Sequence, residues 1–67
     1  MRNQIRALRE ARGWSQTDLG MAVGVTRQAV LAIEKDKHDP SIRLAARIAH
    51  ALEASLAEVF DLDDHAS

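Results

Sequence analysis

The chain has 67 residues, which is enough for one small domain over residues 1–67 and too few for two. It contains no cysteine, so neither a disulfide nor a thiolate metal site can supplement its core. A domain of this length buries only about 60% of its unfolded surface, and association with a second copy would bury more. The absence of cysteine fits a cytoplasmic protein. No apolar run is long enough to span a membrane, and no signal-peptide pattern is present.

Charge is divided unevenly along the chain, although the overall net charge is only −1. All nine lysines and arginines lie within residues 1–47, where five acidic residues leave a net charge of +4. Residues 48–67 carry five acidic residues and no basic one. Two interpretations stay open here: an acidic solubilising tail, or a nucleic-acid face at one end and an assembly end at the other. Charge alone does not choose between them, because +4 is weak for a DNA-binding domain.

Alanine, leucine, arginine and glutamate dominate, which favours helix, and β-branched residues never alternate over a useful length. We therefore predict an all-α domain of five short helices with no strand. The first helix runs to about Arg12 and ends at Gly13. The second follows Ser15, whose capping pattern with Asp18 is a weaker relative of the capping box, and it ends at Gly24.

The remaining helices have similar start signals. Thr26 is a suitable cap for the third helix, and the polar residues 35–40 form the next loop. Ser41 opens the fourth helix, and residues 55–58 form a good capping box for a last short helix. The core is expected to span about residues 4–60, followed by a frayed, flexible acidic tail over residues 61–67.

The stretch from Gln16 to Lys35 carries the most information. Two short helices flank a tight turn, with apolar residues at positions 19, 23, 25, 30 and 33, where two helices crossing at a steep angle need them. Gly20 is small where the two helices must approach closely, and Gly24 stands where the turn needs a positive φ. This coincidence predicts a helix-turn-helix unit.

Three stretches, LREARGWSQTDLG, VGVTRQAVLAIEKDKHDPS and RIAHALEASLAEVF, resemble the phage-repressor-like (Cro or XRE type) helix-turn-helix regulators over about residues 4–60. The resemblance implies a five-helix, lambda-repressor-like domain whose third helix enters the DNA major groove. It also implies a homodimeric transcriptional regulator, a repressor, that binds a palindromic operator in double-stranded DNA. Such a protein would be associated with the nucleoid when bound to DNA.

The resemblance assigns roles to individual residues. Gln16 would bind a phosphate and help to fix the recognition helix in place. Thr26, Arg27 and Gln28 open the third helix, where family members reach base edges. Side-chain chemistry agrees independently, because arginine pairs with guanine O6 and N7 and glutamine with adenine N6 and N7.

Five further residues have open assignments. Leu31 points outward, and either it or Ala32 touches a thymine methyl group, or Leu31 is simply an exposed apolar residue. Lys35, Lys37 and Arg43 either contact the DNA backbone, which would position the protein without specifying sequence, or belong to a solvated face.

Arg9 and Glu34 match a family pair that joins the first helix to the end of the third, which would be a structural ion pair. Trp14 is expected to pack on the second helix with its N–H directed outward.

Three positions depart from the family pattern. Gly20 replaces the usual alanine and should loosen the second helix. Asp36 and Glu53 replace common glycines, so the turn after the third helix can differ and the fourth helix can run on.

The apolar C-terminal residues are the predicted dimer interface, because one recognition helix spans few base pairs and buries little area. These residues are Leu52, Leu56, Val59, Phe60 and Leu62. The alternative is that the last helix, with Leu56, Val59 and Phe60, simply covers the core of one chain.

No nucleophile elbow, P-loop or HExxH motif is present, and the three histidines are far apart in sequence, so we predict no enzyme, catalytic residue or metal site. No cofactor and no small-molecule ligand is expected. The competing hypothesis is a protein–protein interaction module on the same fold, such as an antitoxin-like partner, which the weak basicity keeps open.

Overall fold

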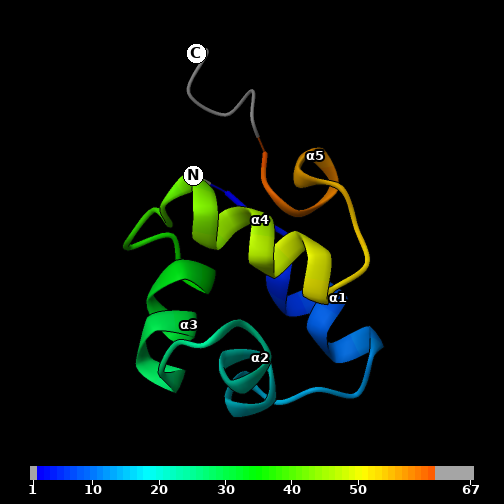
Figure 1. Ribbon diagram of the computed structural model, residues 1–67, viewed down its shortest axis with the longest axis vertical. Helices are drawn as coiled ribbons and strands as arrows, with labels where there is room; N and C mark the ends of the chain where they lie inside the picture. Colours follow the sequence, from blue (N-terminus) through cyan, green and yellow to red (C-terminus); the bar gives the residue numbers. More distant parts are fainter. Residues whose placement is uncertain (1, 62–67) are drawn as a thin grey trace.

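The computed structural model describes residues 2–61. Within that range it has five helices and no strand: α1 (Ile5–Ala11), α2 (Gln16–Val23), α3 (Arg27–Glu34), α4 (Ile42–Ala51) and α5 (Leu56–Val59) (Figure 1). The predicted all-α, five-helix architecture is confirmed. None of the described helices is long and apolar enough to cross a membrane. The predicted tail falls, apart from Asp61, on residues 62–67, which lie outside the described residues.

Side-chain caps start four of the five helices, which is why short segments of this sequence become helical. In each case a hydroxyl oxygen accepts the backbone N–H three residues further on, which otherwise has no partner inside the helix. The capping residues are Ser15, Thr26, Ser41 and Ser55. The first and last of them are complete capping boxes, because Asp18 and Glu58 accept the N–H of Ser15 and Ser55 in return.

Four of the five helices end in a residue with a left-handed backbone: Gly13 after α1, Gly24 after α2, Asp36 after α3 and Glu53 after α4, at φ 74°, 82°, 59° and 54°. At Glu53, its own N–H donates to the His50 carbonyl and the Ala54 N–H donates to the Ala49 carbonyl, which is the Schellman arrangement. The expectation that α4 runs on through Glu53 is therefore wrong. Asp36 likewise keeps the turn that a glycine would favour, because the same pair of hydrogen bonds closes it.

One apolar core joins all five helices. Its buried members come from every helix and from the residues just after α4 and α5: Ile5, Leu19, Val23, Val30, Ile33, Ala45, Ile48, Ala49, Leu52, Val59 and Phe60. In Figure 1, α4 crosses the middle of the molecule, with α2 and α3 on one side and α5 on the other. This arrangement leaves the outer side of α3 uncovered by the other helices.

The two ends of the described chain pair with each other. The Gln4 N–H donates to the Val59 carbonyl at 2.7 Å, and the Asp61 N–H donates to the Arg2 carbonyl at 2.8 Å. Asn3 and Phe60 face each other in this short antiparallel bridge. We call residues 2–4 with residues 59–61 the chain-end pair.

Candidate nucleic-acid interface

The helix-turn-helix unit consists of α2, a turn at residues 24–26, and α3. The turn reverses at Gly24, whose φ of 82° is a conformation that costs glycine little. Gly20 is buried, and a methyl group there would lie 2.7 Å from the Val25 carbonyl oxygen. The glycine thus allows a close approach, as the sequence predicted. The group that approaches it is the backbone of the turn, however, and not the following helix.

One face of α3 packs on the core and the opposite face is open. Val30 and Ile33 are 3% and 2% exposed, so they anchor the inner face. With a rotation of about 100° per residue, the opposite face carries the residues at helix positions 1, 2, 5, 6 and 9. These are Arg27, Gln28, Leu31, Ala32 and Lys35, of which Arg27, Gln28 and Lys35 are exposed and the other two half-buried.

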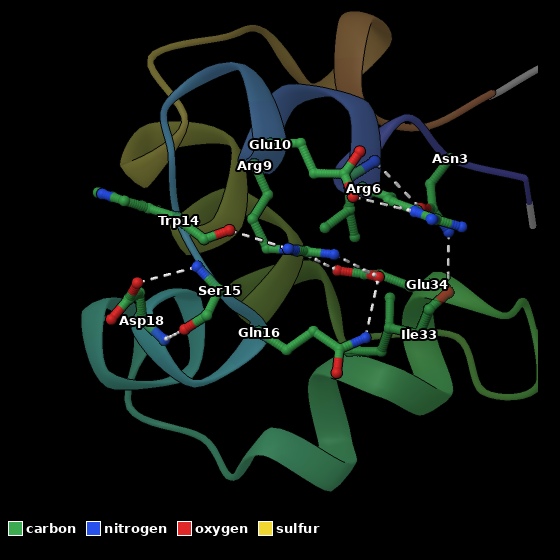
Figure 2. A network of polar contacts seen from close by, with 11 residues as sticks. Asn3, Arg6, Arg9, Glu10, Trp14, Ser15, Gln16, Asp18, Ile33 and Glu34 are labelled. Atoms are coloured by element: carbon green, nitrogen blue, oxygen red, sulfur yellow. Dashed lines mark hydrogen bonds and ion pairs between the residues drawn. The ribbon is translucent and has the colours of Figure 1, made fainter.

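The C-terminal end of α3 is held by a bidentate ion pair. Arg9 on α1 donates from Nε to Glu34 Oε2 at 2.7 Å and from Nη2 to Glu34 Oε1 at 3.2 Å (Figure 2). Both side chains are less than a tenth exposed. The hydrogen bond to Glu34 raises the pKa of the Arg9 guanidinium above its ordinary value, so Arg9 stays charged. The pair implied by the resemblance is present.

Two more groups complete this network. Arg9 Nη1 also donates to the Trp14 carbonyl oxygen at 2.8 Å, which ties α1 to the start of α2. Gln16 Nε2 donates to Glu34 Oε1 at 3.3 Å, so Gln16 contacts α3 from the first residue of α2 (Figure 2). A shallow depression of about 240 Å³ lies beside this network and is lined in part by Gln16, Leu31 and Lys35.

The basic residues predicted to contact the DNA backbone are all exposed. Lys35 and Lys37 follow α3, and Arg43 lies in the first turn of α4. Their side chains, like that of Arg27, form no hydrogen bond or ion pair within residues 2–61. These cations are therefore available to an external anion, whereas Arg9 is not.

Three contacts of the structure were not predicted from the sequence. The Asn3 side chain donates from Nδ2 to the Ile33 carbonyl oxygen at 2.8 Å, close to the end of α3. The Arg12 guanidinium lies over the Trp14 ring, 4.6 Å from its centroid, and donates to Glu53 at 3.0 Å. Asparagine before a helix is a recognisable capping signal, but nothing in the sequence points to a partner thirty residues away.

The structure narrows the predicted dimer interface. Leu52, Val59 and Phe60 are 5%, 0% and 2% exposed within a single chain, so their side chains fill the core. For Val59 and Phe60, the structure thus agrees with the alternative interpretation of the sequence, in which the last helix covers the core of one chain. Leu56 is 40% exposed, and Leu62 lies outside the described residues.

Comparison with known proteins identifies the family. A family model described as Helix-turn-helix (HTH_3) matches residues 5–59. Over 64 residues the chain is 45% identical to YgzD of Bacillus subtilis (strain 168), named an uncharacterized HTH-type transcriptional regulator; the match covers 96% of this chain and 97% of YgzD. The chain therefore belongs to the phage-repressor-like helix-turn-helix family of DNA-binding transcriptional regulators.

Solved structures agree with this assignment. The restriction-modification controller protein C.AhdI of Aeromonas hydrophila has a similar fold, with a TM-score of 0.79 and 32% identity over 85% of this chain and 86% of that one. The DNA-binding domain of the P22 c2 repressor gives a TM-score of 0.80 and 26% identity over 96% of this chain and 84% of that one. Among the residues that the structure describes, no group of three or more His, Cys, Asp or Glu side chains could hold a metal ion.

Proposed function

We propose that this protein binds an operator in double-stranded DNA as a homodimer, with α3 of each copy in the major groove, and acts as a repressor. The observation that carries the proposal is the contrast between the two faces of α3. Its inner face and its C-terminal end are held by the core and by the Arg9–Glu34 pair. Its outer face presents Arg27 and Gln28 without any partner in the described chain.

The outer face has the chemistry that base recognition needs. Arg27 and Gln28 stand in the first turn of α3, and their side chains match the hydrogen-bonding edges of guanine and adenine. Leu31 and Ala32 lie one turn further on and offer apolar surface to a thymine methyl group. Thr26 has its hydroxyl engaged by the Ala29 N–H, so its part is to start the helix beside the DNA.

Backbone contacts would surround these base contacts. A side-chain amide nitrogen carries two hydrogens, so Gln16 can donate one to Glu34 and the other to a phosphate. Lys35, Lys37 and Arg43 supply unpaired positive charge after α3 and at the start of α4. Phosphate contacts of this kind set register and orientation, while the bases supply specificity.

Dimerisation rests on a smaller surface than the sequence suggested. Among the described members of the predicted interface, Leu56 on α5 is the exposed one, and it lies at the acidic end of the chain. Two copies related by a two-fold axis would read half-sites about 34 Å apart, one turn of DNA, and the operator would be palindromic. Because the P22 c2 protein, whose DNA-binding domain has this fold, is named a repressor, we extend that role to this chain. Such a regulator would work at the nucleoid.

Selection of bound duplexes from random double-stranded DNA tests the proposal. We expect a palindrome with half-sites one helical turn apart and two chains per duplex. Affinity for that duplex should fall by orders of magnitude between ~50 and ~200 mM salt, because several phosphate contacts release counterions. No enriched sequence, together with affinity for a protein partner that is insensitive to salt, would favour an interaction module instead.

A further inference from the structure

Asn3 uses both ends of its side-chain amide to join α1 to α3. Its Oδ1 accepts the N–H of Ile5, the first residue of α1, at 3.2 Å. Its Nδ2 donates to the carbonyl oxygen of Ile33, the penultimate residue of α3, at 2.8 Å. Figure 2 shows this side chain reaching α3 beside the Arg9–Glu34 pair. Asn3 is the residue in this network that bonds the backbone of α3.

The backbone of Asn3 is itself held in place. The residues on either side of it are hydrogen-bonded to the far end of the chain, through Gln4 to Val59 and through Arg2 to Asp61. Phe60, opposite Asn3 in this bridge, is 2% exposed and belongs to the core. The hydrogen bonds of the chain-end pair therefore restrain the backbone of Asn3 while its side-chain amide contacts α3.

We propose that Asn3 is a positioning residue for the recognition helix, tying the backbone at the end of α3 to the chain-end pair. The proposal rests on the proposed function for its effect on DNA recognition. Glu34 holds α3 through a flexible side chain, whereas the bond from Asn3 holds the helix backbone directly. Together they define the tilt and the register of α3 along its axis.

A small tilt is enough to matter at the other end of the helix. Arg27 lies six residues before Ile33, which corresponds to about 9 Å along an α-helix. A tilt of about 6° around the Ile33 end therefore displaces the backbone at Arg27 by about 1 Å, more than the ~0.5 Å that precise recognition tolerates. Attraction between exposed cations and phosphates declines gradually with distance, so phosphate contacts tolerate such a shift better than base contacts do. Loss of the Asn3–Ile33 bond should thus reduce sequence discrimination more than overall affinity.

The substitution Asn3→Asp removes this bond. A carboxylate still accepts the Ile5 N–H and suits the start of a helix, but it cannot donate to the Ile33 carbonyl. Gln4→Glu is the matched control, because it makes the same amide-to-carboxylate change at the adjacent, exposed residue, whose side chain has no partner in the described chain. The probes are the duplex selected by the wild-type protein and a scrambled duplex of the same length and composition.

We expect Asn3→Asp to lower the ratio of selected to scrambled affinity about fivefold, the usual worth of one hydrogen bond, with little change in scrambled affinity relative to Gln4→Glu. The proposal would be overturned if Asn3→Asp, like Gln4→Glu, lost affinity equally for the selected and the scrambled duplex. An unchanged ratio for Asn3→Asp would likewise overturn it. If Asn3→Asp does not fold, Asn3→Ser replaces it, because a serine hydroxyl can still accept the Ile5 N–H but is too short to reach Ile33.

Hydrogen exchange tests the positioning role without DNA. The amides of Lys35, Asp36 and Lys37 donate to carbonyls in the last turns of α3. They should exchange about fivefold faster in Asn3→Asp relative to amides of α4. Gln4→Glu, which keeps the Asn3 amide and its bond to Ile33, should leave that ratio unchanged. If the wild-type chain shows no preference for any duplex, the proposed function fails, and this exchange ratio still decides whether Asn3 holds α3.

Discussion

Arg9 and Glu34 meet in a bidentate ion pair that is almost completely shielded from water, with N–O distances of 2.7 and 3.2 Å. The pair links α1 to the last residue of α3, twenty-five positions along the chain. The pair therefore fixes the position of α1 relative to the end of α3.

Removing one partner of this pair should strongly destabilise the fold, because the other partner is left as a buried charge without a counterion. We expect Glu34→Ala or Arg9→Ala to lose about 3–5 kcal/mol of unfolding free energy, comparable with the whole stability of a small domain. Urea denaturation followed by circular dichroism measures this. The exposed Arg6–Glu10 pair is the control, and Arg6→Ala should cost less than about 0.5 kcal/mol. Equal effects of Arg6→Ala and Glu34→Ala would contradict the structural role of the pair.

The left-handed backbone at Glu53 predicts that glycine is more stable than alanine at this position. Glu53→Ala and Glu53→Gly both remove the exposed ion pair to Arg12, but only glycine adopts a φ of 54° without a steric cost. We therefore expect Glu53→Gly to be more stable than Glu53→Ala by about 1 kcal/mol. Thermal unfolding of the two variants measures the difference. If alanine is the more stable of the two, the turn after α4 does not have this conformation.

The two capping boxes predict a loss of stability in acid. Hydrogen bonds from the backbone N–H and the hydroxyl of Ser15 lower the pKa of Asp18, and those of Ser55 do the same for Glu58. A carboxyl whose folded pKa is below its unfolded pKa stabilises the fold above the unfolded pKa. That contribution is lost as the pH falls through the folded pKa.

Urea midpoints should therefore decrease as the pH is lowered from about 5 towards about 3, the range in which carboxyl groups titrate. The double variant Asp18→Asn, Glu58→Gln should show a smaller decrease over the same range. An identical pH profile for the wild type and the double variant would show that the boxes do not hold in solution.

Base readout should depend on Arg27 in a way that backbone contacts do not. On the selected operator, Arg27→Ala should cost roughly 1–3 kcal/mol and relax the preference at one base position. Lys37→Ala should weaken binding to all sequences similarly and reduce the salt slope by about one. Fluorescence anisotropy with single-base operator variants separates the two. An Arg27→Ala protein with unchanged affinity and preference would remove Arg27 from the readout.

Leu56 is now the sharper probe of dimerisation. We expect the protein to sediment as a dimer at micromolar concentration and Leu56→Ser to weaken the dimer at least about tenfold, because the lost apolar contact occurs twice. Met21→Ser, at an apolar residue on α2 that is 79% exposed, should leave the dimer unchanged. Phe60→Ala is unsuitable, because removing a core Phe costs about 3–5 kcal/mol of stability. A monomer bound to DNA as a single copy would rule out the dimer.

The sequence by itself determined the helices and the helix-turn-helix unit, because the interactions that start and stop them are local. Serine or threonine caps and left-handed turns involve residues three to five apart, so Ser15, Thr26 and Gly24 could be assigned from the chain alone. The family pattern added the Arg9–Glu34 pair. Departures from that pattern at Asp36 and Glu53 were misleading, because hydrogen bonds at the helix ends outweighed the backbone preference of a single residue.

Only the tertiary structure decided which apolar residues fill the core and what holds the end of α3. An apolar residue near the C-terminus suits a core or an interface equally well, and the packing of α5 against α4 placed Val59 and Phe60 inside and left Leu56 partly outside. The bond from Asn3 to Ile33 spans thirty residues and ends on a backbone carbonyl, which every residue type possesses. A contact of that kind has no sequence signature, and only the folded chain brings its two ends together.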